Sequence, residues 1–254
     1  MKFRIVLYVS LLIPSFALIS PAMAQDDEND GVAVVVRITP EKGKGDDLVK
    51  AITKYHHWVA DKEGHFEFNW YAISTGPGTG SYIARSGGHN WADLDAEYDW
   101  NDEADKMFDA EVAPLIESTH RMVTRDMDDV SYWPESFEGY THFMVEEWYI
   151  KSGQRAAFMD GLKTIHGHLT AANFGSYYGF ISVVSGGHGN QVQFVGPMKG
   201  WADMVEDDPS FRKIMTDAMG EDEFSEFFSS WAQTYKVGGN MMLVSMPGAS
   251  DYGD

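Results

Sequence analysis

Hydrophobic and polar positions follow the same order in two blocks of this chain. Each block opens on a run of β-branched and aromatic residues, Val32–Ile38 and His142–Ile150, which predicts a strand. An apolar stripe at helical spacing comes next and predicts a helix. The stripes are Leu48, Ile52, Tyr55 and Val59 in the first block and Phe158, Leu162, Ile165 and Leu169 in the second.

A β-hairpin is expected after each of these helices, because alternating segments flank the glycine-rich turns GPGTG and GGHGN. A second helical region is then expected from each Trp-Ala-Asp triplet, as far as Ile116 in the first block and Tyr235 in the second. A closing strand is predicted at Val130–Trp133 and at Met241–Met246.

The two blocks align with each other when Gly31 is placed on Thr141. Positions 31–94 then match positions 141–204 without a gap, and the hydrophobic periods agree as well. The order β-α-β-β-α-β, written twice, predicts an α+β protein made of two tandem ferredoxin-like units. The identical pairs are Val35/Val145, Gly43/Gly153, His56/His166, Gly76/Gly186, Trp91/Trp201, Ala92/Ala202 and Asp93/Asp203.

The repeat divides the chain into segments. We expect a first unit over residues 31–134, a linker over 135–140, a second unit over 141–247 and a flexible tail over 248–254. Each Trp-Ala-Asp triplet is interpreted as the start of a helix, with Asn90 or Gly200 as the cap and the tryptophan packed onto the sheet.

The first 24 residues are typical of a secretory signal peptide. A short basic start precedes an apolar stretch, and Ala22-Met-Ala24 offers a cleavage site before the acidic segment 25–30. Pro14 and Ser15 interrupt the stretch, and no second segment is apolar enough for a membrane anchor. We therefore expect an exported protein, periplasmic or secreted, that is cleaved after Ala24.

The chain has no cysteine and a formal charge of −20, which becomes −22 once Lys2 and Arg4 are removed with the signal. The absence of cysteine excludes disulfides and thiolate chemistry. The negative charge argues against nucleic acid as a partner. No zinc-binding motif or hydrolase motif is present, and we predict no metal site.

Several side chains are candidates for a ligand site. One face of the second predicted strand carries Phe68 and Trp70 in the first unit and Tyr178 and Phe180 in the second. This aromatic face is expected to line an interior pocket, with ordinary core packing as the open alternative. Arg37 aligns with Glu147, and an ion pair between them is a further possibility.

His56 and His166 occupy equivalent positions at the edge of the first helix of each unit. A pair of histidines in this place could act as a general base or bind haem iron, or it could be a structural pair at a helix edge. We therefore include both histidines among the candidate ligand-binding residues, and the catalytic residues stay undetermined.

The doubled βαββαβ pattern, with Trp91 and Trp201 after the third strand of each unit, resembles the dimeric α+β barrel superfamily. This superfamily includes the antibiotic-biosynthesis-monooxygenase-like and NIPSNAP-like groups. The resemblance covers essentially the whole chain after the signal, and it implies that the two units pair into one pseudo-dimeric barrel. Its members include cofactor-free monooxygenases, haem enzymes and isomerases, so fold alone does not give a function.

Three functions are compatible with the sequence. The first is an exported protein that binds a small apolar or aromatic molecule in a barrel pocket. The second is an oxidative enzyme, either cofactor-free or with haem at His56 or His166. The third is an interaction module with a filled barrel. The first is preferred, because no acid, base or nucleophile visibly converges in the sequence.

Overall fold

The computed structural model describes residues 30–250, so the predicted signal peptide, residues 25–29 and the last four residues of the tail lie outside the described part. Eight strands form the sheet. They are β1 (Val32–Pro40), β2 (Asn69–Thr75), β3 (Tyr82–His89), β4 (Ile116–Asp126), β5 (His142–Ile150), β6 (Gly179–Ser185), β7 (Gln191–Met198) and β8 (Tyr235–Ser245).

The strands close into an antiparallel barrel in the order β1-β3-β2-β8-β5-β7-β6-β4. We call β1–β4 with their helices unit one, and β5–β8 with theirs unit two. Each unit contributes four neighbouring strands, in the order β4-β1-β3-β2 or β8-β5-β7-β6. The β2–β8 and β4–β6 pairs join the two units, so a single chain supplies both halves of the barrel.

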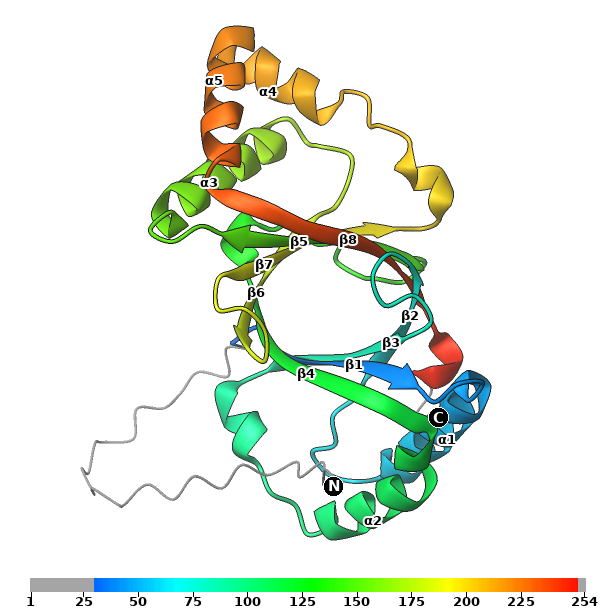
Figure 1. Cartoon of the computed structure of the whole chain (residues 1–254). Helices are drawn as coiled ribbons and strands as arrows, with labels where there is room; N and C mark the ends of the chain where they lie inside the picture. The colour runs from blue at the N-terminus through cyan, green and yellow to red at the C-terminus, as the bar shows by residue number, and fades with distance from the viewer. Residues whose placement is uncertain (1–29, 251–254) are drawn as a thin grey trace, which may run out of the picture.

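Helices cover the barrel on two opposite sides (Figure 1). Unit one carries α1 (Gly45–Val59) and α2 (Asn101–Glu111), and unit two carries α3 (Arg155–Ala171), α4 (Phe211–Met219) and α5 (Glu221–Ala232). Five short 3-10 turns complete the described chain: Trp91–Asp95, Ala113–Leu115, Asp128–Val130, Trp201–Met204 and Pro247–Ala249.

The buried side chains form three clusters, because the strands alternate side chains between the barrel interior and an outer surface, and helices cover much of that outer surface. One cluster packs under α1 and α2 and contains Leu48 and Ile52. A second, rich in aromatic rings, packs under α3, α4 and α5 and contains Phe158 and Trp231. The third lies in the barrel interior and combines side chains of both units: Val35, Ile73, Ile83, Phe143, Val145, Met241 and Leu243.

The strand directions give the barrel two different ends. Strands β1, β2, β5 and β6 run one way and the other four run back. The turns after Thr75 and Ser185 therefore lie at one end, which we call the hairpin end. At the other end β4 stops at Asp126 and the chain crosses to His142 of β5, and we call this the linker end.

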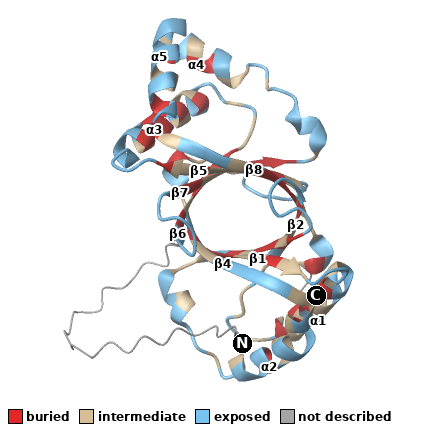
Figure 2. Ribbon diagram, viewed as in Figure 1, coloured by how far each residue is buried: buried red, intermediate tan, exposed pale blue. Residues whose placement is uncertain are grey.

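The strand predicted at Val130–Trp133 is wrong, since the closing strand of unit one is β4, at Ile116–Asp126. The pattern failed because no helix covers the outer face of β4, which is mostly exposed and polar (Figure 2). The closing strand of unit two likewise begins earlier than predicted, at Tyr235, a residue that the apolar pattern predicts within the preceding helix.

The interpretation of the Trp-Ala-Asp triplets is also corrected. Each triplet forms a separate 3-10 turn, and α2 and α4 begin only at Asn101 and Phe211. The carboxylates of Asp93 and Asp203 accept hydrogen bonds from nearby backbone amides, as an N-terminal turn favours. The tryptophans do not pack onto the sheet, because Trp91 is 41% and Trp201 is 52% exposed.

Candidate functional site

The aromatic face proposed from the sequence does not line the barrel interior. Trp70 packs in the cluster under α1 and α2, and Phe68 is partly buried against the same cluster. Tyr178 and Phe180 lie in the cluster under α3, α4 and α5. The opposite face of these strands, with Tyr71, Ile73, Ile181 and Val183, therefore faces the interior.

The two candidate histidines lie in the same helical layers, each beside an aromatic candidate. His56 is only 3% exposed, more buried than its predicted helix-edge position, and its ring centroid is 6.1 Å from that of Trp70. Nδ1 of His166 lies 3.0 Å from the hydroxyl of Tyr178, a hydrogen bond. The structure thus gives two separate pairs, one in each unit, and does not bring the candidates together into one pocket.

The ion pair considered between Arg37 and Glu147 is not formed. The guanidinium of Arg37 contacts Sδ of Met241 at 3.8 Å, and the carboxylate of Glu147 accepts a hydrogen bond from the hydroxyl of Tyr149 at 3.1 Å. Both residues lie near the hairpin end, and within residues 30–250 neither has an oppositely charged partner.

A different ion pair lies at the linker end of the barrel. Nη2 of Arg85, from β3, donates to both carboxylate oxygens of Asp126, the last residue of β4, at 3.1 Å each. The side chains are 31% and 20% exposed, so the pair is half-buried. Gly87 makes room for it, since a Cβ at this position would lie 2.4 Å from Nη1 of Arg85.

Two hydroxyl groups accompany this pair. Thr124, two residues before Asp126 on the same face of β4, is fully buried, and its Oγ1 has no hydrogen-bond partner in the described chain. Tyr71 of β2 packs edge-on against Phe143, with ring centroids 5.2 Å apart. A buried hydroxyl without a partner is uncommon, because its desolvation is then not compensated.

Burial changes the ionisation of this group of residues. It raises the pKa of the Asp126 carboxyl, and the positive charge of Arg85 opposes that rise. It also raises the pKa of the Tyr71 hydroxyl, again opposed by Arg85. Tyr71 is therefore a neutral hydrogen-bonding group at physiological pH.

The segment between the units covers this end with aromatic rings. The indole of Trp133 rests on Gly179, where a Cβ would lie 1.8 Å from the ring. The ring of Phe137 lies between those of Trp133 and Phe143, with centroids 5.9 and 6.1 Å away. We call Tyr71, Arg85, Thr124, Asp126 and these three rings the linker-end site.

The sequence reasoning missed the linker-end site. Arg85 and Asp126 are distant in the chain and match no motif, and the segment containing Asp126 was not predicted as part of a strand. One usable signal was present, because Arg85 follows Ile83 at an interior-facing position of β3 and carries a charge. The role of Trp133 follows only from the path of the linker across the barrel.

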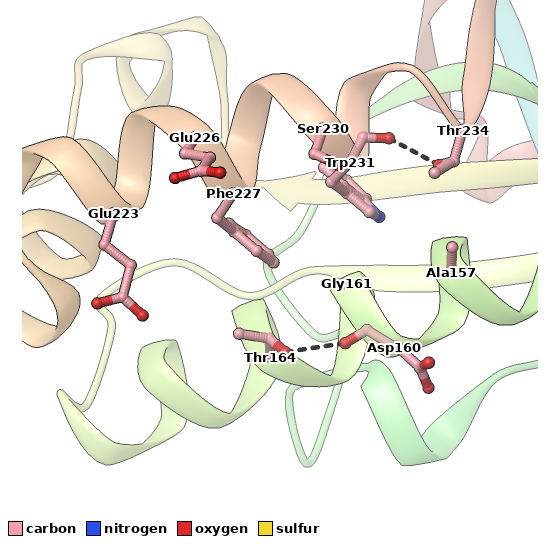
Figure 3. Close-up of a pocket in the computed structure, with 10 residues that line it drawn as sticks. All are labelled: Ala157, Asp160, Gly161, Thr164, Glu223, Glu226, Phe227, Ser230, Trp231 and Thr234. Carbon is pink, nitrogen blue, oxygen red and sulfur yellow. Dashed lines mark hydrogen bonds between the residues drawn. The ribbon is translucent and has the colours of Figure 1, made fainter.

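Two depressions lie on the outside of unit two. One, of about 500 Å³, lies between α3 and α5 (Figure 3). The other, of about 340 Å³, lies between the start of α3 and the turn before β7 and is lined by Lys151, Arg155 and Asn190 among others. Neither is lined by any of the six residues proposed as ligand-binding from the sequence.

Solved structures share this architecture. An anthrone oxidase-like protein is 11% identical, with a TM-score of 0.52 over 87% of this chain and 93% of its own. A chlorite dismutase-like protein is 13% identical, with a TM-score of 0.50 over 87% of this chain and 97% of its own. The chain has the dimeric α+β barrel fold. The resemblance found in the sequence is thereby confirmed, and at these identities the likeness concerns the fold alone.

The other comparisons add no family. Neither the protein-family models nor the curated proteins give a match to this sequence. In the part of the chain that the structure describes, no helix is long and apolar enough to cross a membrane.

No cofactor is predicted from the sequence, but haem is a possible one, with His56 or His166 as its candidate ligand. The buried ring of His56 lies next to those of Tyr55 and Trp70, with centroids 6.5 and 6.1 Å away, and Nδ1 of His166 forms a hydrogen bond with Tyr178. The space beneath α3 is filled by Trp148, Phe158 and other rings of the same cluster. The residues present therefore do not fit a haem plane at either histidine. Over residues 30–250, no three His, Asp or Glu side chains gather as a metal site.

Proposed function

We propose that this protein binds a small aromatic molecule at the linker-end site of its barrel. The observation that carries the proposal is the fully buried Thr124 hydroxyl, without a partner in the described chain, beside the half-buried Arg85–Asp126 pair. A ligand that supplies the missing hydrogen bond would compensate the desolvation of that hydroxyl.

The polar groups define the chemistry of this ligand. Arg85 uses only Nη2 for Asp126, so Nε and Nη1 are still able to donate. The carboxylate of Asp126 accepts, and the pair carries no net charge. A hydroxyl group, which donates and accepts at once, matches this arrangement better than an ion does. The rings of Tyr71, Phe143 and Trp133 provide the apolar wall, and together they favour a phenol.

Two further parts of the proposal concern the origin of the protein and its location. The identical residue pairs and their constant spacing along the chain support a tandem duplication of one ferredoxin-like unit. The signal-like segment before Gln25 supports export to the periplasm or beyond. The mass of the exported protein tests the second point, because cleavage after Ala24 leaves a chain that begins at Gln25.

Native mass spectrometry of the protein isolated from its own cellular compartment tests for a bound molecule. We expect the native mass to exceed the denatured mass by that of one small organic ligand. Equal masses, together with no uptake of phenols, would favour the alternative of an interaction module with a filled barrel.

Titration with 2-naphthol tests the site itself. We expect saturable binding to one site, and about tenfold weaker binding by Arg85→Gln, because one charge-assisted hydrogen bond is lost. Arg121→Gln is the matched control, since this arginine lies on the exposed outer face of β4, the strand that carries Thr124 and Asp126. Equal affinities for the wild type and Arg85→Gln would contradict the proposal.

A further inference from the structure

The larger depression is a groove between two helices of unit two. Its walls are α3 and α5, and α5 has no counterpart in unit one. Its volume of about 500 Å³ lies in the range of sites for small molecules. In Figure 3, the side chains of Phe227 and Trp231 project from α5 toward α3 and form the floor.

The floor of this groove is closely packed. Trp231 is 5% exposed, its Nε1 donates to the carbonyl of Phe158 at 3.0 Å, and its ring stacks on that of Phe158. The close approach of α5 depends on Gly161, where a Cβ would lie 2.0 Å from the indole. The apolar floor is therefore a packed part of the fold and not a loose surface.

The rim of the groove carries only negative charges. Asp160 lines it from α3, and Glu223 and Glu226 line it from α5. None of the three forms an ion pair with another described residue. At the position of unit one that corresponds to Asp160 in the repeat, the chain has Lys50. The acidic rim is thus a property of this groove and not of both units.

We infer that the α3–α5 groove binds a linear polyamine. Such a molecule alternates ammonium groups with methylene segments, so its charges face the acidic rim while its carbons lie against the partly exposed ring of Phe227. Glu223 and Glu226 are three residues apart on one helix face, about 5–6 Å between their Cβ atoms, and suit charges that are separated by a short spacer. A compact metal ion fits less well, because the three carboxylates do not gather at one point.

Isothermal titration of the protein with spermidine tests this inference. We expect one saturable site in wild-type protein and about tenfold weaker binding by the double variant Glu223→Gln/Glu226→Gln. The double variant Glu97→Gln/Asp99→Asn is the matched control, since it removes two exposed carboxylates from a loop of unit one. The control should keep the wild-type affinity.

A second variant distinguishes binding of spermidine in the groove from its general attraction to an acidic protein. Ser230→Phe places a ring in the groove without changing any charge, and Ser230 is an exposed lining residue, so the fold should be retained. We expect binding to weaken by at least about tenfold, because the apolar contact is lost. Unchanged affinity in Ser230→Phe, or equal weakening in the loop control, would overturn the inference in favour of non-specific charge attraction.

Discussion

Units one and two place their first three strands at nearly constant spacing, but they cover them with different helical layers. The number of residues from the start of β1 to the start of β5 equals the number from the start of β2 to the start of β6. The number from the start of β4 to the start of β8 is larger. The additional length of unit two accompanies α5. Its cluster is rich in stacked rings, whereas aliphatic side chains such as Leu48 and Ile52 form much of the unit-one cluster. The barrel therefore tolerates changes in its outer layers, and new surfaces arise there.

The largest expected effects come from truncating one buried side chain under the helices of each unit. Phe158 and Leu48 are equivalent positions, and both are fully buried. We expect Phe158→Ala to lower the free energy of unfolding by about 4 kcal/mol and Leu48→Ala by about 3 kcal/mol. The larger loss in unit two comes from the contacts of Phe158 with Trp148 and Trp231. Urea denaturation measures both, and an equal loss would mean that the ring contacts add nothing.

A smaller effect distinguishes the helix contacts of the two units. Gly161 is equivalent to Ala51, and a Cβ at Gly161 would lie 2.0 Å from the indole of Trp231. We expect Gly161→Ala to destabilise the protein by about 3 kcal/mol through overpacking, despite the better helix propensity of alanine. The converse change, Ala51→Gly, should cost about 1 kcal/mol from propensity alone. If Gly161→Ala were stabilising, the close approach of α5 to α3 would be contradicted.

The linker end gives the next comparison, between Gly179 and its counterpart Asn69. We expect Gly179→Ala to displace Trp133 and to lower the free energy of unfolding by about 2 kcal/mol, because its Cβ would collide with the ring. Asn69 is exposed, so Asn69→Ala should change stability by less than about 0.5 kcal/mol. Tryptophan fluorescence reports the displacement. An unchanged spectrum in Gly179→Ala would argue against the packing of Trp133 on Gly179.

The smallest effect is expected from a substitution that gives unit two the residue type of unit one and removes a single oxygen atom. Tyr178 corresponds to Phe68, and Tyr178→Phe removes the hydrogen bond to His166, at a cost of about 1 kcal/mol near neutral pH. Burial raises the pKa of Tyr178 from 10.0 to about 12. The neutral form is therefore favoured in the folded state.

This pKa gives the substitution a pH signature. The contribution of the raised pKa is fully present below pH 10 and is lost as the pH rises toward 12, with a slope of at most about 1.4 kcal/mol per pH unit. Unfolding measured from pH 9 to 11.5 should show this slope in wild-type protein and a weaker one in Tyr178→Phe. Parallel pH dependences of the free energy of unfolding in the two proteins would show that the pKa of Tyr178 is not raised in the folded state.

Much of the fold could be predicted from periodicity. The strand His142–Ile150 has the predicted bounds, and all four residues of the second helical stripe are buried. In both segments, other elements of the fold pack on the face where the sequence places its apolar residues. The strand β4 escaped prediction because its outer face is exposed and its inner face mixes Met122 with Thr124 and Asp126.

The site could not be predicted in the same way. Alternation separates the two faces of a strand, but it does not tell which face meets a helix and which faces the barrel. Trp70 and Phe180 were therefore placed on the wrong side. The contacts of Arg85 with Asp126 depend on closure of the whole sheet, which brings together residues distant in sequence.

Closure of the barrel by one chain also permits asymmetry. In an assembly of two identical chains, every substitution appears twice, so a cation on one half implies the same cation on the other. Here Arg37 and Glu147 occupy equivalent positions with opposite charges, and Gly179 holds a ring while Asn69 is exposed. Each half can therefore be altered independently, and the barrel can present a one-sided interior to a ligand that has no symmetry of its own.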